Sequence, residues 1–310
     1  MIVTVTMNPA IDKTAEVDEF IVGGLNRLQN TLINPGGKGI NVSKTIQHLG
    51  GESIAMGFVA GASGRYIVDA LNDYHIKNKM VEVVGNTRTN LKILNSKMKL
   101  TELNEEGPII TKEALDLLCN QIIQDVNQDD IVVLSGSVPS TVTKDIYAEI
   151  IHKVKQKGVK VILDADGDLF KNSVVEVPTI IKPNRYELCQ YFKIDENCSL
   201  EELLNKGKLF LDAGIEMIVI SMGSDGAVFM NNDHTAIVKG LKVEAHSSVG
   251  AGDAMVAGIA YALERKFSFD DLIKLSVATS AGAVMTKGTQ PADRKIVDDL
   301  MKKVQIQKIK

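Results

Sequence analysis

The sequence predicts an α/β fold in which a mostly parallel central sheet is flanked by helices. Short, nearly continuous apolar runs alternate with longer stretches of helical spacing, which is typical of strands buried on both faces of a parallel sheet. The chain has 310 residues, 45% of them hydrophobic and 24% charged, so it is long and apolar enough to bury a large core. Its 7 Pro and 25 Gly argue against a disordered or collagen-like chain.

Five apolar runs are the expected strands of this sheet, in chain order 2–6, 131–134, 159–163, 179–181 and 217–221. Residues 144–157 lie between two of these runs, and residues 200–211 between two others. Both stretches place their apolar residues on one face of a helix. Because strand and helix alternate, we expect right-handed crossovers between parallel strands.

Two segments, 13–33 and 87–103, interrupt this alternation of strands and helices. They alternate polar and apolar residues, and so predict short strands joined by turns. Neither segment is long enough to fold alone. We therefore expect one domain spanning 1–310, with a small β-sheet lid built from excursions at about 13–33 and 87–103.

Charge and composition exclude several kinds of partner. The formal net charge is −4, from 35 basic and 39 acidic side chains, so no global positive field attracts nucleic acid or an anionic membrane. No apolar run approaches the length of a membrane span, and the N-terminus lacks a basic region, so we expect a cytoplasmic protein. The three cysteines form no C-x-x-C pair and the five histidines are widely spaced, which predicts reduced thiols and no built-in metal cage.

The first motif is NPGGKGINV at 34–42, which leads into a helical pattern that ends at Gly50-Gly51. Glycine-rich backbone at a helix start exposes N–H groups and lets a ligand approach closely. Lys38 adds a positive charge, and Asn41 adds an amide that can donate and accept. The P-loop spacing G-x-x-x-x-G-K-[ST] is absent. A simple strand-to-helix turn is the alternative interpretation.

The second motif is SSVGAGD at 247–253, which opens a helix of small residues. The consecutive N–H groups of Gly250, Ala251 and Gly252 can form an anion cradle, with the carboxylate of Asp253 beside it. Bound phosphate would repel this acid unless the carboxylate accepted a proton from an attacking hydroxyl. We expect the helix N-terminus to lower the pKa of Asp253. Alternatively, Asp253 only interacts favourably with the helix dipole.

Two further segments, KPNRYE at 182–187 and SMGSDGA at 221–227, follow predicted strands. Ligands of open α/β sheets bind at the carboxyl ends of the strands, where both segments fall. Asn184 and Glu187 can hold hydrated Mg²⁺ and phosphate oxygens, and the glycine-bearing turn can let a nucleotide lie against backbone. A surface turn is the alternative for either segment.

Seven spaced segments together resemble the ribokinase-like (pfkB-type) carbohydrate kinases, within them the branch of 1-phosphofructokinase and tagatose-6-phosphate kinase. The segments are TMNPAID at 6–12, VGGLNR at 22–27, PGGKGINVS at 35–43, TRTN at 87–90, LSGSVP at 134–139, KPN-x-x-E at 182–187 and VGAGD at 249–253. The resemblance covers nearly the whole chain. It implies a ribokinase-like fold with a β-lid, and a homodimer formed through that lid.

The resemblance also implies ATP-dependent phosphorylation of a phosphorylated ketohexose, with Mg²⁺. Fructose 1-phosphate, giving fructose 1,6-bisphosphate, is the leading substrate, and tagatose 6-phosphate is the alternative, because the sequence does not place the existing phosphate at C1 or C6. A ribokinase or nucleoside-type kinase is less favoured, since Arg27 and Arg88 would face a neutral sugar. A non-catalytic sugar- or nucleotide-binding regulator is disfavoured by the intact 250–253 segment.

Site residues follow from the same resemblance. Asp253 is implied as the catalytic base, with an anion hole formed by Gly250, Ala251 and Gly252. The implied substrate-binding residues are Asp12, Arg27, Gly37, Lys38, Asn41, Arg88 and Asn90, of which Arg27, Lys38 and Arg88 hold the existing phosphate. The implied nucleotide-binding residues are Lys182, Asn184, Ser221, Gly223, Gly226 and Ser248, and Glu187 is implied to hold Mg²⁺ through water. Two positions depart from the family pattern: Asp166 stands where Ser is common, and Ala278 where many relatives carry Asn beside the adenine.

Overall fold

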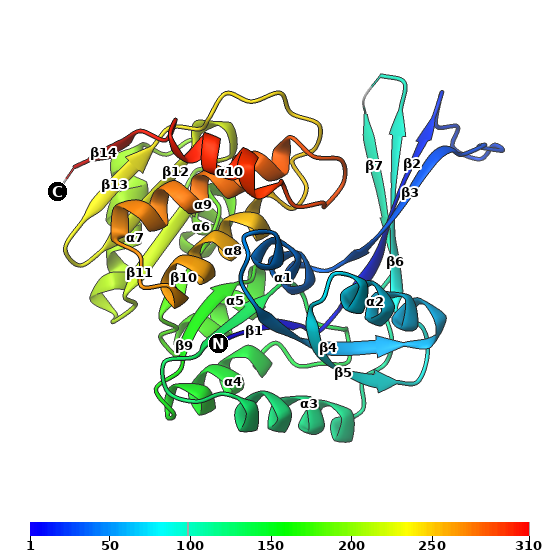
Figure 1. Ribbon diagram of the computed structural model, residues 1–310, viewed down its shortest axis with the longest axis horizontal. Coiled ribbons are helices and arrows are strands. Elements are labelled where there is room, and N and C mark those ends of the chain that lie inside the picture. Colours follow the sequence, from blue (N-terminus) through cyan, green and yellow to red (C-terminus); the bar gives the residue numbers. More distant parts are fainter. Residues whose placement is uncertain (98, 310) are drawn as a thin grey trace.

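A computed structural model describes residues 1–97 and 99–309 (Figure 1). Over these residues the larger sheet has ten strands, in the order β14-β13-β12-β11-β10-β9-β8-β1-β4-β5, and the smaller sheet has four, in the order β3-β2-β6-β7. The larger sheet consists of β1 (Ile2–Thr6), β4 (Ser53–Ala60), β5 (Lys77–Val83), β8 (Ile131–Ser135), β9 (Lys160–Asp164), β10 (Ile180–Ile181), β11 (Met217–Ser221), β12 (Ala227–Asn231), β13 (Thr235–Val238) and β14 (Ile306–Lys308). The smaller sheet consists of β2 (Ala10–Val17), β3 (Gln29–Gly36), β6 (Arg88–Asn95) and β7 (Leu100–Asn104).

The helices connect and cover these strands. They are α1 (Lys38–His48), α2 (Gly61–Asp73), α3 (Lys112–Asp125), α4 (Ile146–Lys155), α5 (Gly167–Val174), α6 (Arg185–Phe192), α7 (Leu200–Asp212), α8 (Ala251–Glu264), α9 (Phe269–Val284) and α10 (Arg294–Met301), with a 3-10 turn, η1 (Gly223–Asp225). The expected helices at 144–157 and 200–211 correspond to α4 and α7. In the part of the chain that is described, no helix has the length and apolar character needed to cross a membrane.

The larger sheet is mostly parallel, as the sequence predicts. From β11 to β5 every neighbouring pair of strands is parallel, whereas β12, β13 and β14 are added antiparallel at one edge. All five expected strands belong to this sheet, and each agrees with its predicted range to within one residue at either end. The prediction of an α/β fold is therefore confirmed.

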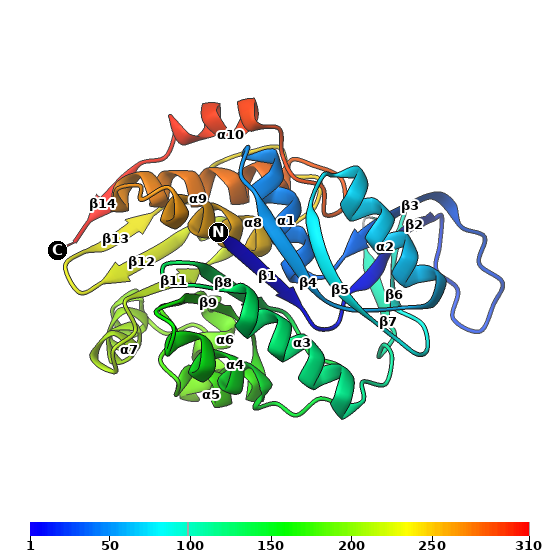
Figure 2. The same ribbon diagram turned by 60° about the horizontal axis from the view of Figure 1, so that its bottom comes forward.

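Side chains alternate across the sheet and build a core on each face. On β8, Val132 and Leu134 pack into one core, and Ile131 and Val133 into the other. Figure 2 shows α3 to α7 on one side of the sheet and α1, α8, α9 and α10 on the other. A fully buried side chain of this kind contributes roughly 1.5–3 kcal/mol relative to an exposed one. The continuous apolar runs are thus explained by helices on both faces.

The smaller sheet is built from the two segments that interrupted the alternation. Three residues separate its strand β2 from the end of β1, and β2 pairs antiparallel with β3 and parallel with β6. Figure 1 shows the sheet standing beside the larger one, next to β4 and α2. The strands begin and end within a few residues of the expected excursions. That the whole chain forms one domain stays a prediction.

Candidate active site

Two cavities lie at the carboxyl ends of the parallel strands, and the first of them lies between these ends and the smaller sheet. The first has a volume of about 320 Å³ and lies between β2, β6 and the starts of α1 and α8. The second has a volume of about 920 Å³ and extends from the start of α8 along β11 and α9. Lys38, Gly250 and Asp253 line both cavities. A ligand in each cavity would therefore meet the other at these three residues.

The start of α8 lies at this meeting point, where the Ala251 N–H donates a long hydrogen bond of 3.4 Å to the carbonyl oxygen of Ser248. Gly250 caps the helix with a φ of 83°, a left-handed conformation that glycine adopts without strain, and no side chain caps the helix. The first N–H groups of a helix have no partner inside it, and they carry the positive end of its dipole. Ala251 and Gly252 line the second cavity. These features support the predicted anion cradle, which stays a prediction.

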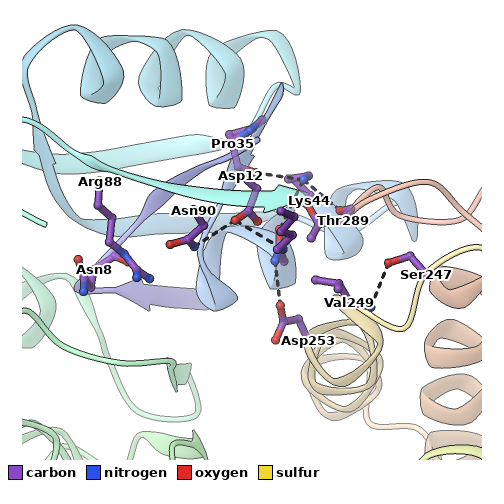
Figure 3. Close-up of polar contacts among 12 residues, drawn as sticks. Asn8, Asp12, Pro35, Lys44, Arg88, Asn90, Ser247, Val249, Asp253 and Thr289 are labelled. Carbon is purple, nitrogen blue, oxygen red and sulfur yellow. Dashed lines mark hydrogen bonds and ion pairs between the residues drawn. The ribbon is translucent and has the colours of Figure 1, made fainter. Parts of the chain in front are cut away.

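Asp253 projects from the first turn of α8 and is buried, with 7% of its surface exposed. Its Oδ2 accepts a hydrogen bond of 2.8 Å from Nδ2 of Asn41 on α1; this bond is the dashed line that ends on Asp253 in Figure 3. Helix α1 starts at Gly37, where φ is 116° and an added Cβ would lie 2.6 Å from Cγ2 of Thr6. Only glycine allows α1 to begin this close to β1, which is what brings Asn41 to Asp253.

Burial raises the pKa of Asp253 to about 6, against the lowering effect of Lys38 and of the hydrogen bond from Asn41. Our expectation of a lowered pKa is therefore wrong. The helix N-terminus that motivated it is present, but the carboxylate loses more hydration than the helix and its neighbours restore. A carboxylate with a pKa near 6 is ionised at neutral pH and is a stronger base than an exposed aspartate.

A buried carboxylate, Asp164, lies beside this site and holds two lysines. Its Oδ1 is 3.2 Å from Nζ of Lys182, its Oδ2 is 3.6 Å from Nζ of Lys38, and Ser135 donates to Oδ2 at 3.1 Å. Burial acts to raise the pKa of Asp164, but Lys182 and Lys38 outweigh it and hold the pKa at about 2. In turn, the charge of Asp164 raises the pKa of Lys38 above its usual value. One carboxylate thus fixes both ammonium groups, that of Lys38 where the two cavities meet and that of Lys182 at the polar end of the second cavity.

One face of β6 forms the lid wall of the first cavity. Arg88, Asn90 and Lys92 alternate along the strand and line the cavity together. Asn90 donates to Oδ1 of Asp12 at 3.1 Å, and Nζ of Lys92 lies 3.7 Å from the same oxygen. The sequence analysis missed Lys92, although the alternation from Arg88 through Asn90 would have indicated it.

Within the part of the chain that the structure describes, no carboxylate forms an ion pair with Arg88. Its Nε donates to the carbonyl oxygen of Asn8 at 3.3 Å, and its Nη1 to that of Glu105 at 3.4 Å. Burial lowers the pKa of Arg88, against the opposing effect of Asp12. A partly buried guanidinium held by two neutral carbonyls can still pair with an anion in the cavity.

Arg27 is the one predicted substrate residue that lines neither cavity. It is exposed on the loop between β2 and β3, whereas Asp12, Gly37, Lys38, Asn41, Arg88 and Asn90 all line the first cavity. The structure of one chain does not bring Arg27 beside Lys38 and Arg88. Its part in phosphate binding stays a prediction.

All the residues predicted on the nucleotide side line the second cavity. They are Lys182, Asn184, Glu187, Ser221, Gly223, Gly226 and Ser248. The rest of the wall is largely apolar, with contributions from Leu241, Val243, Met255, Val277 and Ala281. A long cavity with one polar end and one apolar wall fits a ligand that has a charged part and a flat apolar part.

Neither departure from the family pattern is neutral in the structure. Ala278 on α9 is fully buried in the core and lines neither cavity, whereas its neighbours Val277 and Ala281 face the second one. Residue 278 therefore makes no contact with a ligand in the second cavity, which α9 lines with its neighbours. Asp166 is exposed and lines the first cavity, so it adds a carboxylate near Lys38.

Asn184 and Glu187 form a reciprocal hydrogen-bonded cap at the start of α6. Oδ1 of Asn184 accepts from the Glu187 N–H, and Oε2 of Glu187 accepts from the Asn184 N–H, both at 2.8 Å. This leaves one carboxylate oxygen of Glu187 for a cation. Among the described residues no group of three or more His, Cys, Asp or Glu side chains could hold a metal ion. A cation here would need ligand oxygens and water, which is how Mg²⁺ commonly binds beside nucleotides.

Several buried polar atoms around the first cavity have no protein partner within the described residues. They are Oγ1 of Thr6, Oδ1 of Asn8, Oδ1 of Asn90 and Oγ1 of Thr289. Buried polar groups rarely stay unpaired, so these atoms fit a ligand rich in hydroxyl groups. Thr289 is a cavity residue that the sequence analysis did not identify, since it lies in a loop without a recognised pattern.

The chain is similar along nearly its whole length to known sugar kinases. Residues 5–296 match the pfkB family of carbohydrate kinases. The chain is 34% identical over 311 residues to the 1-phosphofructokinase of Bacillus subtilis, and the match covers 100% of both chains. It is 31% identical to a tagatose-6-phosphate kinase of Staphylococcus epidermidis over 99% of both chains. The fold is shared with phosphofructokinase-2 of Escherichia coli, with a TM-score of 0.92 and 24% identity over 97% of this chain and 98% of the other.

Proposed function

The chain belongs to the pfkB family of carbohydrate kinases, and from that premise we propose that it transfers the γ-phosphoryl group of ATP to fructose 1-phosphate, giving fructose 1,6-bisphosphate. The observation that supports this most is the meeting of the two cavities at Asp253, Lys38 and Gly250. The smaller cavity takes the phosphosugar and the larger one takes ATP. Arg88 lies away from Asp253, beyond Asn90 in Figure 3, where a phosphate already on the sugar would sit.

The reaction forms a bond between the sugar O6 and the γ-phosphorus and breaks the bond from that phosphorus to the leaving oxygen of ADP. Asp253 accepts the proton that O6 loses. Because the transition state is loose, most of the catalysis comes from positioning and from stabilising charge on the transferred group. The N–H groups of Gly250, Ala251 and Gly252 and the ammonium of Lys38 supply that stabilisation.

Mg²⁺ accompanies ATP in this proposal, and when bound it neutralises charge on the phosphate oxygens. Glu187 has one carboxylate oxygen free to hold the hydrated ion through water. Lys182 is fixed by Asp164 at the polar end of the second cavity, where it pairs with a phosphate oxygen. The side-chain nitrogen of Asn184, Nδ2, can donate there, since only the side-chain oxygen is used to cap α6.

Tagatose 6-phosphate is the second candidate substrate, because a tagatose-6-phosphate kinase is 31% identical over almost the full length. Both sugars are phosphorylated ketohexoses, and Lys38 and Arg88 can serve either phosphate. Arg27 is proposed to join them from the exposed lid loop.

Exposed apolar side chains on this loop, Ile21, Val22, Leu25 and Leu28, support a homodimer formed through the lid. Sedimentation of the protein would test this oligomeric state. The proposed location of the protein is the cytoplasm.

A coupled assay of ATP consumption tests the proposal with four sugars. We expect the highest kcat/KM with fructose 1-phosphate, lower values with tagatose 6-phosphate and fructose 6-phosphate, and the lowest with unphosphorylated fructose. A preference for tagatose 6-phosphate would move the assignment to the second candidate. Absence of turnover with all four sugars would instead favour a non-catalytic regulator.

A further inference from the structure

Lys44 is a fully buried lysine on α1, one turn after Asn41 (Figure 3). Its Nζ donates to the carbonyl oxygen of Thr289 at 3.1 Å and to that of Pro35 at 3.3 Å, and it lies 3.5 Å from Oδ1 of Asn41. All three partners are uncharged oxygens. Burial lowers the pKa of Lys44 to about 8, against the raising effects of Asp12 and Asp253. The protein thus retains a buried ammonium at a cost in stability, and the proposed reaction does not yet use it.

The contact with Asn41 determines which way its amide points. The oxygen of the amide faces the ammonium of Lys44, so the NH₂ group faces Oδ2 of Asp253. A flipped amide would place two N–H donors against the ammonium and its oxygen against the carboxylate, and both contacts would be repulsive. The charge of Lys44 therefore holds Asn41 in the orientation that stabilises the ionised form of Asp253.

The contact with Thr289 fixes a second part of the site. The side chain of Thr289 lines the first cavity, and its Cα lies 3.7 Å from where a Cβ on Gly250 would be. The third contact, with Pro35, reaches the end of β3, where the lid strand returns to α1. One ammonium thus joins the lid strand, the helix that carries Asn41 and the loop beside the anion hole.

We propose that Lys44 is a positioning residue for phosphoryl transfer, which orients Asn41 toward Asp253 and holds the Thr289 loop against the start of α8. The inference rests on the proposed function in one respect, namely that Asp253 is the base. Lys44 lines neither cavity, so it acts through its neighbours and not by touching either substrate.

The first test replaces Lys44 by methionine, which is similar in length but carries no charge. We expect kcat at neutral pH to fall about 10- to 100-fold, the range for losing a residue that orients a reacting group, while KM for ATP stays within about twofold. Lys44→Arg keeps the charge and should recover most of the loss. Lys153→Met, on the exposed face of α4, is the matched control and should leave kcat unchanged.

The pH profile separates positioning from a structural role. The charged and titratable groups around Lys44 are Asp12 on β2, Asp253 on α8, His48 on α1 and Tyr74 after α2, whose ring centre is 5.9 Å from Nζ. Removing the ammonium should raise the pKa of Asp253 above about 6, so the acid limb of kcat moves to higher pH. His48→Gln should leave that limb in place. A carboxylate NMR titration of Asp253 gives the same shift independently of turnover.

A double-mutant cycle tests the route through Asn41. In an Asn41→Ala background, Lys44→Met should cost no more than about threefold further in kcat, because the two residues act as a unit. The proposal would be overturned if Lys44→Met lowered kcat as much in the Asn41→Ala background as in the wild-type protein. It would also be overturned if Lys44→Met alone kept kcat within about twofold of wild type with an unchanged acid limb. If Lys44→Met does not fold, Lys44→Gln is measured against the same criteria. Absence of turnover in the wild-type protein would instead count against the proposed function, while the NMR shift would still test Lys44.

Discussion

The amide nitrogen of Asn41 lies 2.8 Å from the carboxylate of Asp253, although 212 residues separate them in the chain. Each residue sits within the first turn or so of a helix that starts at a glycine with positive φ, Gly37 for α1 and Gly250 for α8. The proposed base is therefore held by the packing of two helix starts against each other. Changes at this contact should affect the chemistry more than the binding of either substrate.

Replacing Asp253 by asparagine removes the proposed proton acceptor and keeps the size of the side chain. We expect kcat to fall by about 10³-fold, the typical contribution of a positioned general base. ATP affinity should stay within a few-fold, since the second cavity has many other lining residues. Steady-state kinetics and nucleotide titration measure both quantities. Near-normal turnover would remove Asp253 from its role.

The same substitution should make the protein more stable. Burial raises the pKa of the Asp253 carboxyl from 3.8 to about 6 in the folded state, so the folded protein favours the protonated form, and ionisation above that pKa destabilises it. The cost at neutral pH is at most about 3 kcal/mol, at 1.36 kcal/mol for each unit of pKa. Asp253→Asn should raise the free energy of unfolding at pH 7 by about 1–3 kcal/mol in urea denaturation. A loss of stability would contradict this account.

Activity should depend on pH through the same carboxyl group. Because Asp253 must be ionised to accept a proton, kcat/KM should fall as the pH drops below about 6. Protonation of a single group lowers kcat/KM by about tenfold for each pH unit below its pKa. The substrate phosphate also titrates near this pH. The residual activity of Asp253→Asn therefore serves as the control: it should keep the substrate's titration and lose that of the enzyme. Identical profiles for the two proteins would refute the assignment.

Much of the fold could be predicted because its signals are local. The runs that form β8 and β11 are apolar throughout, since helices cover both faces of the sheet, and the small sheet differs from them by its alternation. By contrast, β4 contains Ala and Gly at several positions, and its sequence gives little sign of a strand. Its place beside β1 depends on packing against residues far away in the chain.

Site residues were predictable where a glycine-rich turn or a strand end marked them. Thr289 and Lys44 could not be found in this way, because one lies in a loop without a motif and the other in the middle of a helix. The pKa of Asp253 was predicted in the wrong direction for a related reason. The sequence shows the helix start beside it but not the depth of burial that the surrounding elements produce.

Arg88→Ala tests the phosphate-binding end of the first cavity. Losing one charge-assisted contact with the sugar phosphate should cost about 2 kcal/mol in kcat/KM, or roughly 30-fold. Any turnover of unphosphorylated fructose should be much less affected, and KM for ATP should not change. Arg88→Lys, which keeps the charge but not the planar guanidinium, should have a kcat/KM between those of wild type and Arg88→Ala. An unchanged kcat/KM for the phosphosugar would contradict the assignment.

Asp164→Asn tests the buried carboxylate that holds Lys38 and Lys182. Lys182 and Lys38 lower the folded-state pKa of Asp164 from 3.8 to about 2, despite burial, so its ionised form stabilises the fold above about pH 4, and this contribution is lost as the pH falls through about 2. The shift alone corresponds to about 2 kcal/mol, and leaving the buried Lys182 and the partly exposed Lys38 without their partner should bring the loss at pH 7 to about 3–5 kcal/mol.

Denaturant unfolding between pH 7 and pH 3 measures this difference. The gap in unfolding free energy between Asp164→Asn and wild type should be largest at neutral pH and should begin to close as the pH falls below about 4, where the Asp164 carboxyl of the unfolded chain starts to bind a proton while that of the folded protein stays ionised. Asp166→Asn is the matched control, because this carboxyl is two residues away and exposed, and its removal should change stability by less than about 0.5 kcal/mol. A gap that stayed constant across this pH range would mean that Asp164 stabilises the fold by packing and not by its charge.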